Sequence, residues 1–274
     1  MNRTTMSYMV ATIVSFAALG ALVMGPTLAM AQSQFMNTAA TTGGGTSDPT
    51  TTSTNPACGQ VVSGNVTLTS NLNCAGDGLI VGADGTQVNL NGYTIQGPGK
   101  DSSKVGIMIP ATDRVLVTGP GAISGFQAGV LMTGARHTKV STLIAQDNQI
   151  AMFMTGTSDT MISENILKRN TIGIAAHSAS AIDAETNILT GNALAGITMV
   201  NSFGSTLAMN TVEGSTNGIF LDPQSHDNVV DSNTALKNVQ DLNNANGLPP
   251  NINKNDFKND LCTTSSPSGL CKGT

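Results

Sequence analysis

The chain has 274 residues and a net charge of −5 at pH 7, with 12 basic and 17 acidic residues. Binding to nucleic-acid phosphates needs clustered Lys and Arg, so this composition argues against a nucleic-acid partner. The absence of Trp and an aromatic content of 3% also leave few rings for stacking on sugars.

The first 31 residues have the layout of a secretory signal peptide. A positive charge at Arg3 precedes an apolar run at about 9–25, and the small-residue cleavage site is Ala29-Met30-Ala31. A retained anchor is the alternative, although the run is short for a bilayer span of about 20 residues. Cleavage after Ala31 leaves no transmembrane span, so we expect a secreted, periplasmic or cell-surface protein.

A flexible tether and one folded domain follow the signal peptide. Residues 32–57 are rich in Thr, Gly and Ser and contain few groups that could form a core. Residues 58–274 are long enough for one domain with a substantial buried core.

The four cysteines suggest two disulfides in an exported chain. Spacing favours Cys58 with Cys74 and Cys262 with Cys271, one pair at each end of the domain. A thiolate metal site is the alternative, but the C-x-x-C pairs typical of zinc sites are missing.

Short apolar strands recur every 22 or 23 residues and indicate a solenoid. They begin at residues 106, 129, 151, 173, 196, 218 and 241. Asparagines keep the same period in two sets, Asn165, Asn187, Asn210, Asn233 and Asn255, and Asn148, Asn170, Asn192 and Asn238. We expect the asparagines to lie at tight bends, where Asn tolerates left-handed geometry and stacked amides bond one another.

Alternating apolar residues separated by Gly, Asn, Ser and Thr leave no room for helices in each repeat. The predicted fold is therefore all-β, a single-stranded right-handed parallel β-helix of about eight coils of 22–23 residues. At about 4.8 Å per coil the stack would be about 40 Å long.

The segment "CGQVVSGNVTLTSNLNCAGDGLIVGADGTQVNLNGYTIQGPG", the N-x-[ILVA]-x-x-N corners and the ending "LCTTSSPSGLC" resemble secreted right-handed parallel β-helix proteins of the pectin-lyase-like superfamily. This superfamily includes pectate lyases, polygalacturonases and the periplasmic copper-maturation β-helix proteins. The resemblance covers residues 58–271 and implies the fold, whereas one fold of this kind hosts many functions.

The first strand of each repeat predicts an apolar outer face. Strand alternation places Ile107, Val130, Met152, Ile174, Ile197 and Ile219 inside, followed by Ile109, Met132, Met154, Ala176, Met199 and Leu221. The outward positions include Leu131, Phe153, His177, Phe220 and Asp222. Such a face is either a binding face or one covered by the tether or tail. We expect noncatalytic binding of an envelope or extracellular polysaccharide, or of a protein partner.

Two other functions remain open, a polysaccharide lyase or hydrolase and a passive structural rod. The best acidic group combines Asp183 and Glu185 with Glu164 one coil earlier, beside Lys168 and Arg169. These residues are the weak catalytic candidates, and a solvated, charge-balanced edge is their alternative interpretation. A lyase would need calcium held by carboxylates on adjacent coils.

No metal site or other cofactor is predicted. The three histidines, His137, His177 and His226, form no pair at metal-ligand spacing. Thioethers suit Cu(I), but most methionines of the repeats fall on inward positions and are expected to fill the core.

Overall fold

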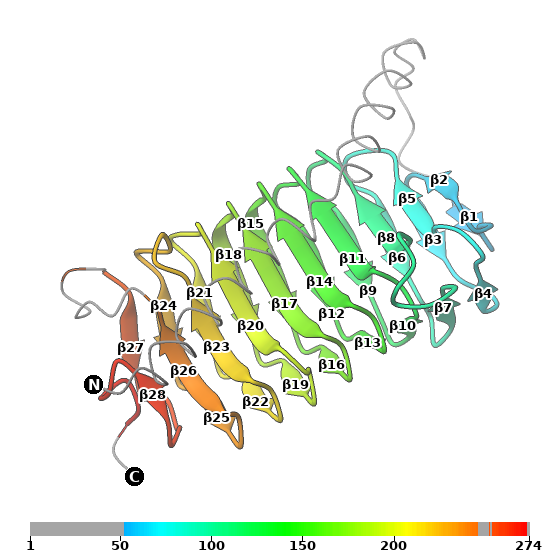
Figure 1. Ribbon diagram of the computed structural model, residues 1–274. Helices are drawn as coiled ribbons and strands as arrows, with labels where there is room; N and C mark the ends of the chain where they lie inside the picture. The colour runs from blue at the N-terminus through cyan, green and yellow to red at the C-terminus, as the bar shows by residue number, and fades with distance from the viewer. Residues whose placement is uncertain (1–51, 246–251, 253, 273–274) are drawn as a thin grey trace. The chain divides into compact units, whose positions relative to one another are not determined.

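The computed structural model describes residues 52–245, 252 and 254–272. The predicted signal peptide and most of the predicted tether lie outside these residues. The described strands stack coil upon coil into three parallel sheets of ten, ten and eight strands (Figure 1). The predicted all-β, right-handed parallel β-helix is confirmed.

Each coil passes through the sheets in the same order, and we number the sheets accordingly. Sheet 1 contains β2 (Gln60–Val62), β5 (Leu79–Val81), β8 (Val105–Ile109), β11 (Ala128–Thr133), β14 (Ile150–Thr155), β17 (Ile172–His177), β20 (Ala195–Val200), β23 (Asn217–Leu221), β26 (Gln240–Asn244) and β28 (Ser265–Ser266). Sheet 2 contains β1 (Thr52–Thr54), β3 (Asn65–Thr67), β6 (Gln87–Asn89), β9 (Leu116–Thr118), β12 (Lys139–Ser141), β15 (Ser158–Ser163), β18 (Ser180–Glu185), β21 (Thr206–Ala208), β24 (Val229–Asp231) and β27 (Asp256–Lys258). Sheet 3 contains β4 (Leu72–Asn73), β7 (Thr94–Gln96), β10 (Ala122–Ser124), β13 (Ile144–Gln146), β16 (Ile166–Lys168), β19 (Ile188–Thr190), β22 (Thr211–Glu213) and β25 (Thr234–Leu236).

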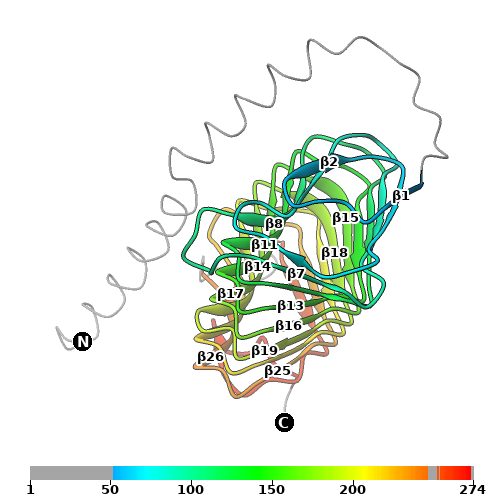
Figure 2. The same ribbon diagram turned by 90° about the vertical axis from the view of Figure 1, so that its right-hand side faces the viewer.

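The core lies inside the coils, which superimpose when viewed along the stack (Figure 2). Val130 pairs with Ile107 on one side and with Met152 on the other, and all three belong to the buried core. The other predicted inward residues of sheet 1 are also in the core. The predicted register is therefore confirmed.

Sheets 1 and 2 contain ten strands each and sheet 3 contains eight, in keeping with the prediction of about eight coils, but the first coils break the period. Register partners in sheet 1 lie 19 residues apart between Gln60 and Leu79, and 28 apart between Leu79 and Ile107. Strand β1 also lies within the predicted tether, since Thr52–Thr54 pair with β3. The ladder of sheet 2 thus begins before Cys58.

The asparagines form buried ladders between sheets. The Oδ1 atom of Asn187 accepts hydrogen bonds from the N–H and from Nδ2 of Asn165, both at 3.0 Å. Its Nδ2 donates to the Ile162 carbonyl at 2.8 Å and to Asn210 Oδ1 at 3.0 Å. Each rung therefore satisfies backbone and side-chain groups that would otherwise be buried without partners.

Two details of the predicted bends were wrong. The left-handed residue is the one before each asparagine, such as Glu164 with φ of 59°, and the asparagine side chain is buried in the corner. Asn255 also belongs to another ladder, because its Oδ1 accepts from Asn228. Asp260 takes the place after Asn233.

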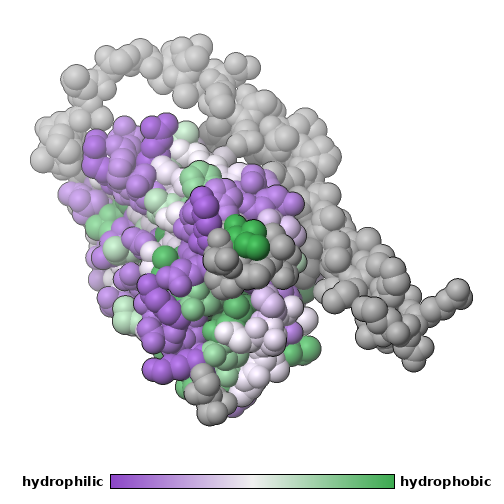
Figure 3. All heavy atoms as spheres, turned by 90° about the vertical axis from the view of Figure 1, so that its left-hand side faces the viewer, coloured by the Kyte–Doolittle hydropathy of each residue, from purple (hydrophilic) through white to green (hydrophobic). Residues whose placement is uncertain are grey.

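Both predicted disulfides are present. Cys58 bonds Cys74 in the first coils, and Cys262 bonds Cys271 at the opposite end. The described surface at the C-terminal end is largely hydrophilic, with apolar patches among the polar side chains (Figure 3). Among the described residues, no helix is long and apolar enough to cross a membrane.

Candidate functional site

The outer rows of sheet 1 form the predicted apolar face. The term "outer rows of sheet 1" denotes two rows of residues from here on. The first row is Met108, Leu131, Phe153, Ala175, Thr198 and Phe220, and the adjoining second row is Thr133, Thr155, His177 and Val200. Each residue lies beside its equivalent on the next coil. The first row alternates with core residues and is itself outside the core, so its side chains point outward as predicted.

These outward side chains are shielded from water. Leu131 is 4% exposed, Phe153 5% and Phe220 6%. Equivalent outward residues on sheet 3 are open, since Ile166 is 37% exposed and Ile188 46%.

Two polar atoms within the outer rows of sheet 1 are buried without a hydrogen-bond partner, His177 Nδ1 and Thr198 Oγ1. Asp222, predicted as a binding residue, lies in a turn beyond β23. Its Oδ1 accepts from the N–H of Asn201 at 3.0 Å and from the N–H and hydroxyl of Ser225 at 2.8 and 2.7 Å. Asp222 therefore has its own structural role.

The weak catalytic candidates do not form one cluster. Asp183 and Glu185 lie on β18 in sheet 2, and the Glu164 N–H donates to the Glu185 carbonyl, which makes these two residues neighbours. Arg169 lies beyond β16 in sheet 3, where it makes a bidentate pair with Asp147 at 2.9 and 2.7 Å. The cation and the acidic residues thus belong to different edges.

The Arg169 pair is electrostatically self-contained. The hydrogen bond from Arg169 lowers the pKa of Asp147 and raises the pKa of Arg169 itself. Both side chains are about half exposed, and such surface pairs contribute little to stability. This geometry fits the alternative interpretation of a charge-balanced edge.

Two histidine–carboxylate pairs lie on the turns between sheets 1 and 2. His137 Nδ1 is 2.6 Å from Asp113 Oδ1, and this hydrogen bond is the main cause that lowers the pKa of Asp113. His226 Nδ1 is 2.7 Å from Asp227 Oδ2, and the His226 ring stacks on Phe203 with centroids 5.4 Å apart.

Neither histidine pair was predicted from the sequence. For His137, the signal was the position of Asp113 one coil earlier, 24 residues before it. For His226, the partner is simply the next residue in the chain.

Histidine, cysteine and carboxylate side chains do not gather into a metal site within the described residues. No group of three His, Cys, Asp or Glu side chains within 52–245 and 254–272 could hold a metal ion. The four cysteines are oxidised. Met132, Met152, Met154 and Met199 are fully buried in the core, as the sequence predicted.

Three of the similar solved structures each superimpose on part of this chain. A DFA-IIIase from Arthrobacter chlorophenolicus is 16% identical with a TM-score of 0.48, covering 64% of this chain and 47% of its own. A periplasmic alginate epimerase is 13% identical with a TM-score of 0.40, covering 75% and 65%. An alginate lyase from Paenibacillus is 11% identical with a TM-score of 0.42, covering 76% and 90%. Similarity at this level carries no information about activity.

The chain spans about half the length of the DFA-IIIase. A search of curated proteins gave no match. A family described as "Periplasmic copper-binding protein (NosD)" matches residues 59–269, which include most of the described β-helix. Two disulfides agree with an oxidising compartment outside the cytoplasm. The chain is an exported protein and belongs to the NosD family.

Proposed function

We propose that this chain is a noncatalytic binding protein of the cell envelope, with a polysaccharide or protein partner on the outer rows of sheet 1. One observation carries the proposal: the first of these rows is mainly apolar from Met108 to Phe220, and its residues line up from coil to coil. The outer row of sheet 2 includes charged residues such as Lys139 and Asp183. Apolar surface gathered on one face is typical of a contact site.

The shape of the outer rows of sheet 1 supports an extended partner. Equivalent residues repeat at the spacing of parallel strands, about 4.8 Å, so six coils present about 24 Å of regular surface. The buried polar atoms His177 Nδ1 and Thr198 Oγ1 lie among the apolar groups. A partner with both apolar faces and hydroxyl or amide groups would satisfy both kinds of contact.

A polysaccharide lyase or hydrolase is the first alternative. Hydrolysis by paired carboxylates needs two groups held at a defined separation, and a calcium-dependent lyase needs several carboxylates on one face. Asp183 and Glu185 lie two residues apart on one strand, without a partnered cation. The arrangement therefore favours binding over turnover.

Copper binding is suggested by the family description alone. The described donors do not fit it, because the cysteines are oxidised and four methionines fill the core. The histidines His137 and His226 lie on turns four coils apart, about 19 Å by the strand spacing. We therefore base no step of the function on copper.

The test is to measure binding and turnover in the same samples. The purified mature protein is incubated with acidic and neutral polysaccharides, with and without calcium, and affinity electrophoresis is run beside assays for unsaturated and reducing ends. We expect retardation by at least one polymer without product. Turnover that disappears in Asp183→Asn or Glu185→Gln would establish an enzyme instead. Absence of binding to every polymer and to envelope proteins would favour the passive rod.

A further inference from the structure

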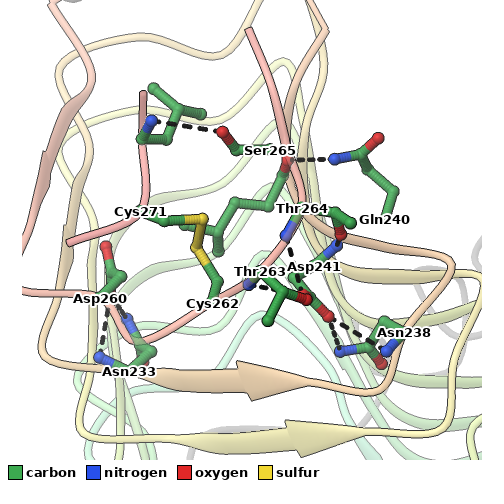
Figure 4. Close-up of a disulfide and its surroundings, with 12 residues drawn as sticks. Asn233, Asn238, Gln240, Asp241, Asp260, Cys262, Thr263, Thr264, Ser265 and Cys271 are labelled. Atoms are coloured by element: carbon green, nitrogen blue, oxygen red, sulfur yellow. Dashed lines mark hydrogen bonds between the residues drawn. A yellow bond between two sulfur atoms is a disulfide. The ribbon is translucent and has the colours of Figure 1, made fainter. Parts of the chain in front are cut away.

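The first asparagine ladder ends in a carboxyl group. Asn165, Asn187, Asn210 and Asn233 occupy successive coils, and Asp260 follows them next to the C-terminal disulfide (Figure 4). Asp260 Oδ1 accepts from the N–H and Nδ2 of Asn233 at 2.8 and 2.9 Å. This oxygen therefore does what each asparagine Oδ1 does for the coil before it.

The second oxygen of Asp260, Oδ2, corresponds to the Nδ2 atom of each asparagine, which donates a hydrogen bond to a backbone carbonyl of sheet 2. The Nδ2 atoms of the four asparagines donate to the carbonyls of Val140, Ile162, Ala184 and Leu207, which are register partners on successive strands of sheet 2. Leu207 pairs with Val230, so Val230 supplies the equivalent carbonyl for the next rung. Asp260 is fully buried, and its Oδ2 has no hydrogen-bond partner among the described residues.

We propose that Asp260 holds a proton on Oδ2, directed to the Val230 carbonyl, and that its ionisation loosens the C-terminal coil. An ionised carboxylate has only acceptors, as does a carbonyl, so these two groups can share a hydrogen bond only when the acid is protonated. The proton thus replaces the amide hydrogen found at every earlier rung.

The surroundings of Asp260 favour the neutral acid. Burial raises the pKa of Asp260 to about 6, against the opposing hydrogen bonds from Asn233. The negative charge of Asp231 on β24 raises it further. Lys258 on β27 is 4.0 Å from Asp231 and 3.3 Å from Asp256, so its charge is shared between those carboxylates. Lys272 contributes its backbone N–H to the Asp260 carbonyl.

A second carboxyl group in the C-terminal part of the stack, that of Asp241, has a lowered pKa instead of a raised one. Asp241 accepts from the N–H and Nδ2 of Asn238, from the N–H and hydroxyl of Thr263, and from the N–H of Thr264 (Figure 4). Burial alone would raise the pKa of Asp241, but the hydrogen bonds from Thr263 and Asn238 bring it below the usual value. One fully bonded, ionised carboxylate and one protonated acid therefore sit at the same end of the stack.

The sign of the pH dependence follows from the raised pKa. The folded state binds the Asp260 proton more tightly than the unfolded state, so this stabilisation is complete below pH 3.8. It is lost as the pH rises from 3.8 through about 6, and is constant above that. The difference between these two pKa values corresponds to a change of up to about 100-fold in the equilibrium constant for opening of the C-terminal coil.

The experiment uses the mature protein with both disulfides intact. The carboxyl carbon of Asp260 is titrated by NMR, and amide exchange at Asn233 is measured between pH 4 and pH 8, corrected for intrinsic rates. Asp260→Asn restores the ladder residue, and Asp256→Asn changes an exposed carboxyl on β27 as the matched control.

We expect Asp260 to titrate near pH 6 and protection at Asn233 to fall as the pH rises through that value. The fall should persist in Asp256→Asn and vanish in Asp260→Asn. Titration of Asp260 near its ordinary value in the folded wild-type protein would overturn the proposal, as would an unchanged fall in Asp260→Asn. The wild-type titration decides the question even if a variant fails to fold.

Discussion

Ser215→Asn should stabilise the protein, because Ser215 interrupts the second asparagine ladder. Asn148, Asn170 and Asn192 stack on successive coils, and each of the first two bonds the Oδ1 of the next. Ser215 takes the following position, where its hydroxyl is buried without a partner. Asn238 resumes the ladder by accepting the Ser215 N–H at 2.9 Å.

The size of the effect follows from the missing bonds. An amide at this position would offer an oxygen to Asn192 and hydrogens to Asn238 Oδ1 and, by register, to the Leu189 carbonyl. Each bond contributes about 1 kcal/mol net, and ordering one side chain offsets part of the sum. We expect a gain of about 1–2 kcal/mol, which raises Tm by about 2–6 °C at this chain length.

Thermal unfolding and amide exchange at Asn192 measure the global and the local effect. Asn192→Ser is the matched control, since it creates the same defect one coil earlier and should destabilise by about 2 kcal/mol. A Ser215→Asn protein with unchanged Tm and unchanged exchange at Asn192 would refute the idea that ladder bonds are additive from coil to coil.

Other consequences of the fold can be measured directly. Gly78→Ala should destabilise strongly, because its Cβ would clash with the Gly106 carbonyl oxygen, whereas Gly76→Ala, with open space around it, should change stability by less than about 1 kcal/mol in urea unfolding. Reduction of the two terminal disulfides should raise amide exchange in the end coils before the middle, since each loop closure contributes about 3 kcal/mol; uniform loosening would contradict this. Lowering the pH below 3.8 should weaken the Asp113–His137 contact, because the stabilisation that comes from the lowered pKa of Asp113 is complete above 3.8 and is lost as the pH falls through the folded-state pKa; NMR titration of Asp113 checks the direction.

The period of the chain predicted sheet 1 well, because burial of one face repeats with each coil. Val130 and Met152 are inward for the same reason that the sequence repeats, namely that each coil buries its apolar face on the next. The strands β2 and β5 break the period, so they could not be found in this way.

The outward orientation of the side chains in the candidate site could be predicted from the sequence, but the groups that surround them could not. Strand alternation places Phe153 outward, but it contains no information about what shields that ring from water. The Asn255 ladder was misplaced because a longer connection follows β26, and the step from Asn228 to Asn255 is 27 residues rather than 23. Pairing of His137 with Asp113 depends on side-chain rotamers at a left-handed turn, which periodicity does not specify.

The comparison of two matched double variants tests the central claim most directly. Leu131→Ser with Phe153→Ser alters neighbouring residues on the outer rows of sheet 1, and Ile166→Ser with Ile188→Ser alters neighbouring residues on the outer face of sheet 3. Both proteins are checked for folding by circular dichroism and then titrated with the polymer that retards the wild type. The account predicts that only the sheet 1 variant loses affinity, by at least about tenfold. Equal affinity in the two folded variants, or loss only in the sheet 3 variant, would contradict it.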